Sequence, residues 1–401
     1  MKWRAVLFLL AAVGMLVALP TAAQVPEIPV GIIYPRTGEL ARLGETVVQA
    51  SLMAADDINN AGGIKSLGGA RIRPIVADNR SDATIQRTET ERLITRYRLV
   101  AINGSYASSL TLVGTEVAER LKVPWVTGSI ADPITGRGFK YVFQVSPKAS
   151  MFGKMQVDFA AELLKQARVA GKKKVAILYE DTAYGTSTSK GLLDRSKELG
   201  LEVALYEAYK AGITDAAPLV TKVRASGADI LFPVSYLTDA ILLIKTLKEQ
   251  GVNVVVIGGG AGYLMPEFYQ GLGKLAEGVF SVGSWNWDLP YKPIKDVAER
   301  YKRRTGEFIQ EHAGEGYAIM WIIANALERA RSTDPQKVRD ALAKTDLKPP
   351  HPGAIMPGGC IKFDSTGWNT CVHPVMVQWQ DGELRTVWPP SVATVKARLP
   401  W

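Results

Sequence analysis

Residues Gly104–Leu121 read GSYASSLTLVGTEVAERL, and this stretch decides the fold. The apolar run Leu99–Ile102 precedes it and predicts a short buried strand, while the spacing of apolar residues after the serines predicts an amphipathic helix. Ser108 or Ser109 is a natural N-cap, because a hydroxyl there can accept a hydrogen bond from a free backbone N–H of the first turn. The same N–H groups and the positive end of the helix dipole can hold a small anion. A serine-rich turn that only caps its helix is the alternative.

Strands and helices alternate on both sides of this stretch. Apolar runs such as Val30–Tyr34 and Lys174–Tyr179 predict buried strands, and segments with helical spacing such as Glu45–Asn60 follow them. This alternation predicts the α/β class, with a parallel sheet covered by helices on both faces. The pattern restarts after an extended segment near Phe143–Pro147, and Gly278–Gly283 is expected to cross back. We therefore predict two doubly wound parallel-sheet lobes, joined by three crossings, with one cleft that can close around a ligand.

The predicted domain limits follow from these crossings. Residues 1–23 form a secretory signal peptide, because Lys2 and Arg4 precede an apolar segment and small residues up to Ala23 offer a cleavage site. Lobe 1 is predicted to comprise residues 24–145 and 283–352, and lobe 2 residues 146–282 and 353–401. No later stretch is long and apolar enough to span a bilayer, so the mature protein is expected to be soluble and exported.

The cysteines indicate the compartment of the protein, and the distribution of charge indicates which partners to expect. Cys360 and Cys371 are predicted to form one disulfide, since a low, even count is typical of exported chains, and two free thiols on adjacent strands are the alternative. Cys360–Phe363 and Cys371–Trp379 are expected to form a hairpin. The net charge is +9, but the basic residues are scattered and no nucleic-acid motif occurs, so we expect a solvated basic surface and no nucleic-acid partner.

Four loops that follow predicted strands carry the candidate binding groups. Their residues are Ser108 and Ser109, then Ser129, Ala131 and Asp132, then Asp181 and Tyr184, and finally Ser235 and Tyr236. Ligands of open α/β sheets bind beyond the carboxyl ends of the strands, so these groups predict a site for a small molecule with an anionic end and an apolar body. For each tyrosine, packing is the alternative. A fifth loop, Gly258–Tyr263, lacks the context of a nucleotide motif and is interpreted as a close backbone approach to a ligand or a neighbouring strand.

The sequence offers little for catalysis or metal binding. His312, His351 and His373 are far apart in the sequence and lie outside the four loops. No H-E-x-x-H, C-x-x-C or G-x-S-x-G motif occurs. We therefore expect no enzyme activity, no catalytic residue, no metal and no cofactor.

Six segments together resemble a known family. They are Val30–Ile64, Gly104–Thr111, Val123–Pro147, Val175–Ser187, Asp229–Tyr236 and Gly316–Ala330. In combination they resemble the periplasmic Leu/Ile/Val-binding protein family, the substrate-binding components of branched-chain-amino-acid-type ABC importers, over essentially the whole mature chain. The resemblance implies the type I periplasmic-binding-protein fold, a periplasmic location, a small-molecule solute, ABC permease subunits as partners and a monomer.

The resemblance also implies roles for residues of the predicted loops. Ser108 is similar to the family serine that holds the ligand carboxylate, and Ser129 to the small residue whose backbone receives the ligand ammonium. Ala131 stands where the next contact is usually a threonine. Tyr184 and Tyr236 are similar to the aromatic contacts of lobe 2.

The glycine loop departs from the family pattern. Gly260 and Ala261 stand where amino-acid binders of this family often place an acid for the ligand ammonium. A buried ammonium without a counter-charge is costly, so Asp132 or Asp181 would have to replace that acid. The expected ligand is an amino acid, an amide, or a small aromatic or aliphatic carboxylate.

The leading hypothesis is a periplasmic solute-binding protein of an ABC importer, which captures its solute by hinge closure without covalent chemistry. The alternative is a periplasmic ligand sensor that signals to a membrane receptor. A hydrolase of the same solutes would need a nucleophile–base pair, for which the sequence offers no candidate.

Overall fold

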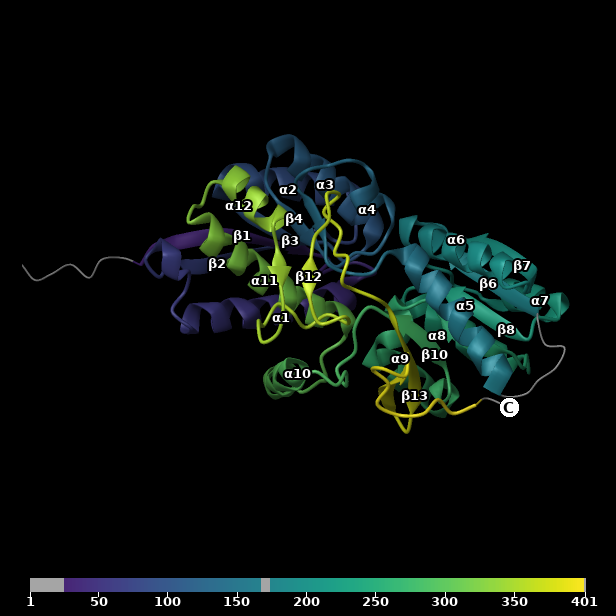
Figure 1. Cartoon of the computed structure of the whole chain (residues 1–401). Helices are drawn as coiled ribbons and strands as arrows, with labels where there is room; N and C mark the ends of the chain where they lie inside the picture. Colours follow the sequence, from purple (N-terminus) through teal and green to yellow (C-terminus); the bar gives the residue numbers. More distant parts are fainter. Residues whose placement is uncertain (1–24, 167–173, 400–401) are drawn as a thin grey trace, which may run out of the picture.

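The computed structural model describes residues 25–166 and 174–399, which form two α/β lobes beside each other (Figure 1). The predicted signal peptide, residues 1–23, lies outside the described residues. Across the described part of the chain, every helix is too short or too polar to cross a lipid bilayer. The predicted α/β class with two sheet-based lobes is confirmed.

Lobe 1 is built on a parallel sheet with the strand order β2-β1-β3-β4-β5. Its strands are β1 (Glu27–Tyr34), β2 (Arg71–Asp78), β3 (Ala101–Gly104), β4 (Trp125–Thr127) and β5 (Val142–Gln144). Its larger helices are α1 (Ala41–Asn60), α2 (Ala83–Tyr97), α3 (Ser108–Leu121), α10 (Lys292–Thr305), α11 (Glu311–Ala330) and α12 (Pro335–Ala343), and α4 (Pro133–Gly136) is short.

Alternating side chains of β1 show why helices cover both faces of this sheet. Ile32 belongs to the apolar cluster that includes residues of α1 and α11, whereas Ile33 belongs to the cluster with residues of α2 and α3. Successive residues of a strand point to opposite faces, so a run of apolar residues requires a cover on each side.

Lobe 2 is built on a sheet with the strand order β14-β13-β10-β9-β8-β6-β7. Its strands are β6 (Lys174–Glu180), β7 (Glu202–Tyr209), β8 (Ile230–Val234), β9 (Val255–Gly258), β10 (Phe280–Gly283), β13 (Val375–Gln380) and β14 (Glu383–Trp388). Its helices are α5 (Ala149–Gln166), α6 (Ala183–Glu198), α7 (Ala217–Ser226), α8 (Leu237–Glu249) and α9 (Pro266–Leu272). The strands from β10 to β7 are parallel, and β13 and β14 are antiparallel additions. The segment Gly278–Gly283, expected to cross back, instead contributes β10 to this sheet, and the chain leaves it after Gly283.

The predicted hairpin between Cys360–Phe363 and Cys371–Trp379 is only partly right. Phe363 and Asn369 form an antiparallel bridge, and the N–H of Thr370 donates to the carbonyl of Lys362 at 2.9 Å, but the chain beyond Cys371 does not continue this pairing. The short strand β12 (Ile361–Lys362) pairs with β11 (Asp346–Leu347), while β13 pairs with β10 and β14. All six residues of β13 are buried, because it lies inside the second sheet rather than at the edge of a small hairpin. The sulfurs of Cys360 and Cys371 are bonded, with the Cα atoms 5.7 Å apart.

The segment around Trp368 stays with lobe 1 and lies along β5. The N–H of Gln144 donates to the carbonyl of Gly367 at 2.9 Å, and the N–H of Asn369 donates to the carbonyl of Gln144 at 2.9 Å. The indole Nε1 of Trp368 donates to the carbonyl of Ser146 at 3.1 Å. We therefore place the third crossing between Trp368 and β13, later than the predicted boundary at 352/353.

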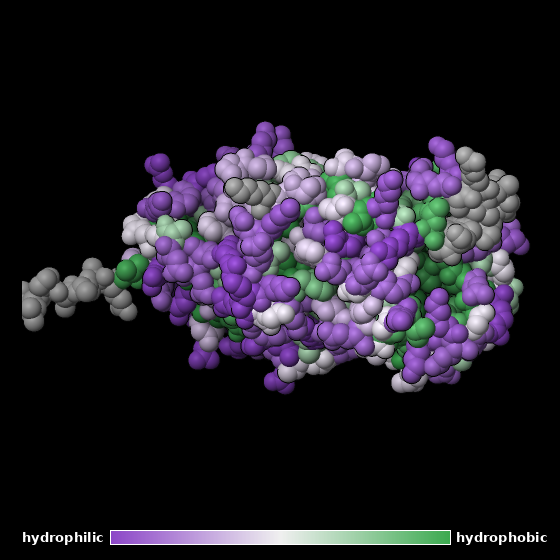
Figure 2. All heavy atoms as spheres, turned by 90° about the horizontal axis from the view of Figure 1, so that it is seen from below, coloured by the Kyte–Doolittle hydropathy of each residue, from purple (hydrophilic) through white to green (hydrophobic). Residues whose placement is uncertain are grey.

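Hydrophilic residues cover most of the face seen in Figure 2, and hydrophobic residues show in smaller areas between them. Among the described residues, the exposed large hydrophobic side chains are Val25, Leu199, Tyr206, Leu275 and Leu399. They come from different segments, which is ordinary for the surface of a folded domain.

Candidate functional site

A small cavity lies between the two lobes. From lobe 1 it is lined by Tyr106, Ser108 and Ile130, from lobe 2 by Phe152, Tyr184, Tyr236 and Ala261, and from the start of α11 by Glu311 and His312. Six of these residues follow the carboxyl end of a strand: two follow β3, and one each follows β4, β6, β8 and β9. The cavity is thus at the place where open α/β sheets bind ligands.

The structure brings half of the predicted ligand contacts to this cavity. Ser108, Tyr184, Tyr236 and Ala261 line it. The remaining four, Ser109, Ser129, Ala131 and Gly260, are not among its lining residues.

Two of these four residues, Ser129 and Gly260, use their polar groups in hydrogen bonds inside the protein. The hydroxyl of Ser129 donates to the carbonyl of Ser105 at 2.7 Å and lies 2.6 Å from the hydroxyl of Thr111. The N–H of Gly260 donates to Ser281 Oγ at 3.1 Å. These hydrogen bonds therefore fix the loops that carry the lining residues.

The prediction that Ser108 or Ser109 caps α3 is wrong. Helix α3 begins at Ser108, its N-cap residue is Ala107, and no side chain caps it. The hydroxyl of Ser108 instead accepts from the N–H of Ala131 at 3.1 Å, which joins the loops after β3 and β4. Since Ser108 still lies in the first turn of α3, it brings both its hydroxyl and the positive helix end to the cavity.

Tyrosines form the wall of lobe 2. The hydroxyl of Tyr184 donates to the carbonyl of Gly259 at 2.7 Å, and its ring centroid is 5.3 Å from that of Tyr236. Burial raises the pKa of both hydroxyls well above the ordinary value of tyrosine. Both side chains are therefore neutral, and both line the cavity.

Sequence reasoning missed a buried charged cluster at the start of α11. The imidazole of His312 stacks on Tyr106 with ring centroids 4.4 Å apart. Its Nδ1 is 3.3 Å from Glu311 Oε2, and its Nε2 is 3.9 Å from Glu315 Oε2. Burial works to lower the pKa of His312, but the carboxylates of Glu315 and Glu311 outweigh it and raise the pKa to about 9. His312 is therefore a cation at neutral pH.

The carboxyl groups of Glu311 and Glu315 also accept hydrogen bonds from the segments that cross between the lobes. Ser146, just after β5, donates through its hydroxyl to Glu315 Oε1 at 2.7 Å. Ser284, just after β10, donates through its hydroxyl to Glu311 Oε1 at 2.6 Å. Burial raises the pKa of Glu315 to about 7, although the nearby His312 acts to lower it. Glu315 thus titrates near neutral pH.

We expect the unfolding free energy to fall as the pH rises from about 6.5 to 9. The folded-state pKa of His312, about 9, lies above its ordinary 6.5, so its stabilising contribution is complete below 6.5 and lost as the pH rises through 9. Glu315 changes the unfolding free energy in the same direction, because its folded-state pKa of about 7 lies above its ordinary 4.5. Its stabilising contribution is complete below pH 4.5 and is lost as the pH rises through 7. The His312 contribution is on the order of 3 kcal/mol.

Urea unfolding at several pH values measures this slope. The double variant His312→Gln/Glu315→Gln should flatten it between pH 7 and 9, because removal of His312 alone would raise the pKa of Glu315 into this range. Tyr106 and Tyr236 remain protonated because burial raises their pKa values. An equal slope in wild type and variant would contradict the assignment.

The acids suggested by the sequence do not line the cavity. The carboxylate of Asp132 accepts from the N–H and the hydroxyl of Ser150, at 2.9 and 2.5 Å, at the start of α5. Asp181 is exposed. The acid of the cavity wall is Glu311. The signal that could have found it is the group of three ionisable residues within five positions, just before the apolar segment 317–324. Within residues 25–166 and 174–399, no group of three or more His, Cys, Asp and Glu side chains could hold a metal ion.

Comparisons with known proteins agree with this architecture. A family model described as periplasmic binding protein matches residues 27–383. Leu/Ile/Val-binding protein homolog 8 of Brucella abortus (strain 2308) is 31% identical over 386 residues, which cover 94% of each chain. Leu/Ile/Val-binding protein homolog 7 of Brucella melitensis biotype 1 is 30% identical over 392 residues, which cover 96% of each chain.

Solved structures share the fold. A leucine-binding protein from Thermotoga maritima superimposes with a TM-score of 0.79 at 22% identity, covering 91% of this chain and 99% of that one. A branched-chain amino acid transporter substrate-binding protein from Streptococcus pneumoniae, in complex with isoleucine, gives 0.78 at 24% identity and covers 90% of this chain and 100% of that one. A solute-binding protein of an ABC transporter from Rhodopseudomonas palustris, in complex with 3,4-dihydroxybenzoic acid, superimposes with a TM-score of 0.77 at 22% identity. The match covers 89% of this chain and 95% of that one. The fold is the type I periplasmic-binding-protein fold, and the chain belongs to the periplasmic binding protein family, in which it is similar to the Leu/Ile/Val-binding proteins.

Proposed function

We propose that this protein is the solute-binding component of an ABC importer, acting in the periplasm after removal of its signal peptide. It captures a small amino acid, or a related small carboxylate or amide, by closure of the two lobes, and as a monomer delivers it to permease subunits. The observation that carries this proposal is the cavity between the lobes, where Ser108, His312 and Glu311 face the aromatic wall of lobe 2.

The chemistry of the cavity wall fits such a solute. For a carboxylate, the hydroxyl of Ser108 offers a hydrogen-bond donor and the imidazolium of His312 offers the opposite charge. An ammonium finds Glu311, which supplies the acid that the glycine loop lacks. Tyr184 and Tyr236 contact the apolar body. Relatives of this fold hold isoleucine or 3,4-dihydroxybenzoic acid, and both carry a carboxylate.

A thermal-shift screen of the mature protein, followed by calorimetry, tests the proposal. The panel holds leucine, isoleucine, valine, small amides, urea, and benzoate-type and short aliphatic acids. A solute that binds only the folded state raises the melting temperature by mass action. Binding without turnover, together with recovery of permease subunits in a periplasmic pull-down, supports the importer. Recovery of a membrane receptor in their place, or turnover of a bound solute, contradicts it.

Closure has a specific ionic contact. Arg42 of α1 in lobe 1 forms ion pairs with Glu267 of α9 in lobe 2 and with Glu307. Arg42→Gln should weaken solute affinity about two- to fivefold, because a half-exposed pair contributes less than about 1 kcal/mol to the closed state. Calorimetry with a solute found in the screen measures this change.

Arg36→Gln is the matched control. Arg36 Nε is 2.7 Å from Glu45 Oε2, and both residues belong to lobe 1. The control removes an ion pair of similar exposure without touching the other lobe, so its affinity should equal that of the wild type. Equal losses in both variants would argue against a role of Arg42 in closure.

A further inference from the structure

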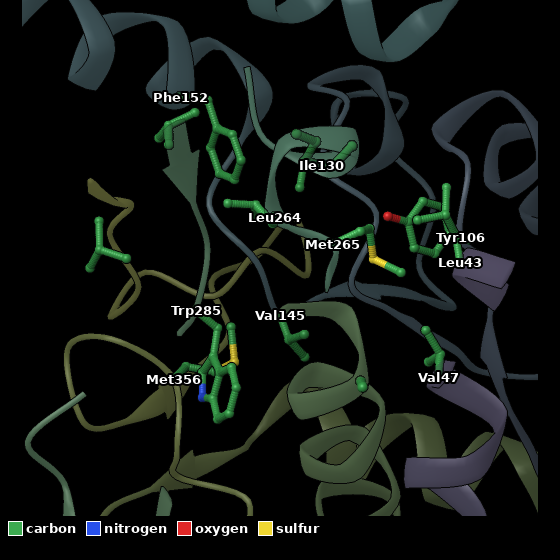
Figure 3. Packing of buried hydrophobic residues seen from close by; sticks show 14 of the residues in the cluster. Leu43, Val47, Tyr106, Ile130, Val145, Phe152, Leu264, Met265, Trp285 and Met356 are labelled. Carbon is green, nitrogen blue, oxygen red and sulfur yellow. The ribbon is translucent and has the colours of Figure 1, made fainter. Parts of the chain in front are cut away.

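A second small cavity adjoins the first along the start of α11. It shares four lining residues with the first, Glu311 and His312 among them, and adds Thr46, Leu264, Met265 and Gln310. Figure 3 shows Leu264 and Met265 near Tyr106, which lines both cavities. The two cavities are therefore neighbouring parts of one site, with the charged pair between them.

The side chain of Gln310 is the unusual feature of the second cavity. The residue is 4% exposed, and neither its amide oxygen nor its amide nitrogen has a hydrogen-bond partner among the described residues. Gln310 is the N-cap residue of α11, but its side chain makes no capping bond. Buried amides are normally paired, because an unpaired polar group loses its bonds to water without replacement. The amide thus has no structural role that the protein itself supplies.

Four residues line the second cavity but not the first, and among them the amide of Gln310 is the polar side-chain group without a hydrogen-bond partner. The hydroxyl proton of Thr46 is donated to the carbonyl of Leu43 at 2.8 Å, and Leu264 and Met265 are apolar. An amide side chain offers both an acceptor and donors, so its complement is a group that also carries both. A branched alkyl end would leave the amide unpaired, and a second carboxylate would lie near Glu311.

We propose that Gln310 forms a specificity-determining subsite that binds a terminal carboxamide or ureido group of the solute, while the charged end of the solute occupies the first cavity. The inference rests on the proposed function, since it names the solute class of the same site. Amide-ended solutes should therefore bind more tightly than alkyl-ended solutes of the same shape, because only the former pair both atoms of Gln310.

Calorimetry with matched pairs of solutes tests this. The pairs are asparagine with leucine, glutamine with homoleucine, and succinamic acid with 4-methylpentanoic acid, and in each pair a carboxamide replaces an isopropyl group. We expect the wild type to prefer the amide about tenfold or more in at least one pair. Gln310→Met, which keeps the side-chain volume, should reduce that preference to within about twofold while the affinity for the alkyl member is kept.

The melting temperature of the ligand-free variant provides a second readout. Because the amide has no partner to lose, Gln310→Met should melt at or above the wild-type temperature. A lower melting temperature, equal affinities within every pair, or a preference that persists in the variant would overturn the inference. Failure of all three pairs to bind would also overturn it, whereas binding of any other solute of the screening panel would leave the proposed function standing.

Discussion

His312→Gln is expected to lower the affinity for solutes that carry a carboxylate by about 100-fold or more. His312 carries the positive charge among the residues that line the first cavity, and its pKa of about 9 keeps it protonated at neutral pH. Without it, a bound carboxylate would face Glu311 and the nearby Glu315 with no compensating cation. Removal of one partner from a buried, hydrogen-bonded charge cluster costs about 2–5 kcal/mol of binding free energy, and 2.7 kcal/mol corresponds to 100-fold.

Calorimetry at pH 7 with a carboxylate found in the screen measures this loss, and His351→Gln is the control. His351 is also partly buried in lobe 1, but it packs against Trp321 and its pKa is lowered by burial. The control variant should bind like the wild type. A loss below tenfold in His312→Gln would show that Ser108 and the start of α3 hold the carboxylate without the imidazolium.

The alternation of strands and helices could be predicted because it depends on local patterns. Val30–Tyr34 and Lys174–Tyr179 are apolar on both faces, and such runs indicate strands between two layers of helices. The late segments were harder, because their strands are paired by tertiary contacts. Ile361 and Lys362 pair with residues 14 and 16 positions earlier, and Val375–Gln380 pairs with β10, almost one hundred residues upstream, as well as with β14.

The site could be predicted only where it follows strand ends. Tyr184 and Tyr236 come directly after strands, so topology alone brings them to the cleft. His312 lies on a helix that begins after the second crossing, and nothing in its local sequence reveals that this helix starts beside Ser108. The charge of His312 likewise depends on Glu311 and Glu315, which become its close neighbours only through the helix and the burial.

Ser108 was correctly predicted to lie at the cavity, but its predicted role as a helix cap was wrong. Its sequence context suggested a helix cap, yet its hydroxyl bonds the N–H of Ala131 in the neighbouring loop. A long-range partner of this kind competes with the local capping bond, and sequence alone does not show which partner is nearer.

Asp288→Ala is expected to lower the unfolding free energy by about 3–5 kcal/mol, because Asp288 is a buried acceptor that several groups share. The residue is 7% exposed and follows β10 on the second crossing. Its carboxylate accepts from Asn286 Nδ2 at 2.8 Å, from the N–H of Thr386 at 2.9 Å and from Arg385 Nε at 3.2 Å. It also accepts from the hydroxyls of Thr386 and Thr394. Urea unfolding of the ligand-free protein, followed by tryptophan fluorescence, measures the change.

Two further variants separate this network from an ordinary surface effect. Asp296→Ala changes an exposed aspartate on α10 and should stay within about 0.5 kcal/mol of the wild type. Asp288→Asn keeps the side-chain shape and one acceptor oxygen, but its N–H₂ group faces other hydrogen-bond donors. Its unfolding free energy should therefore lie between those of the wild type and Asp288→Ala. The donors left behind in Asp288→Ala include the backbone N–H of Thr386, whose residue is fully buried inside β14, so water cannot replace the carboxylate there. If Asp288→Ala were as stable as Asp296→Ala, the second crossing would be held by its apolar packing, and the fixed geometry of the cleft would have to come from Trp285 and its neighbours instead.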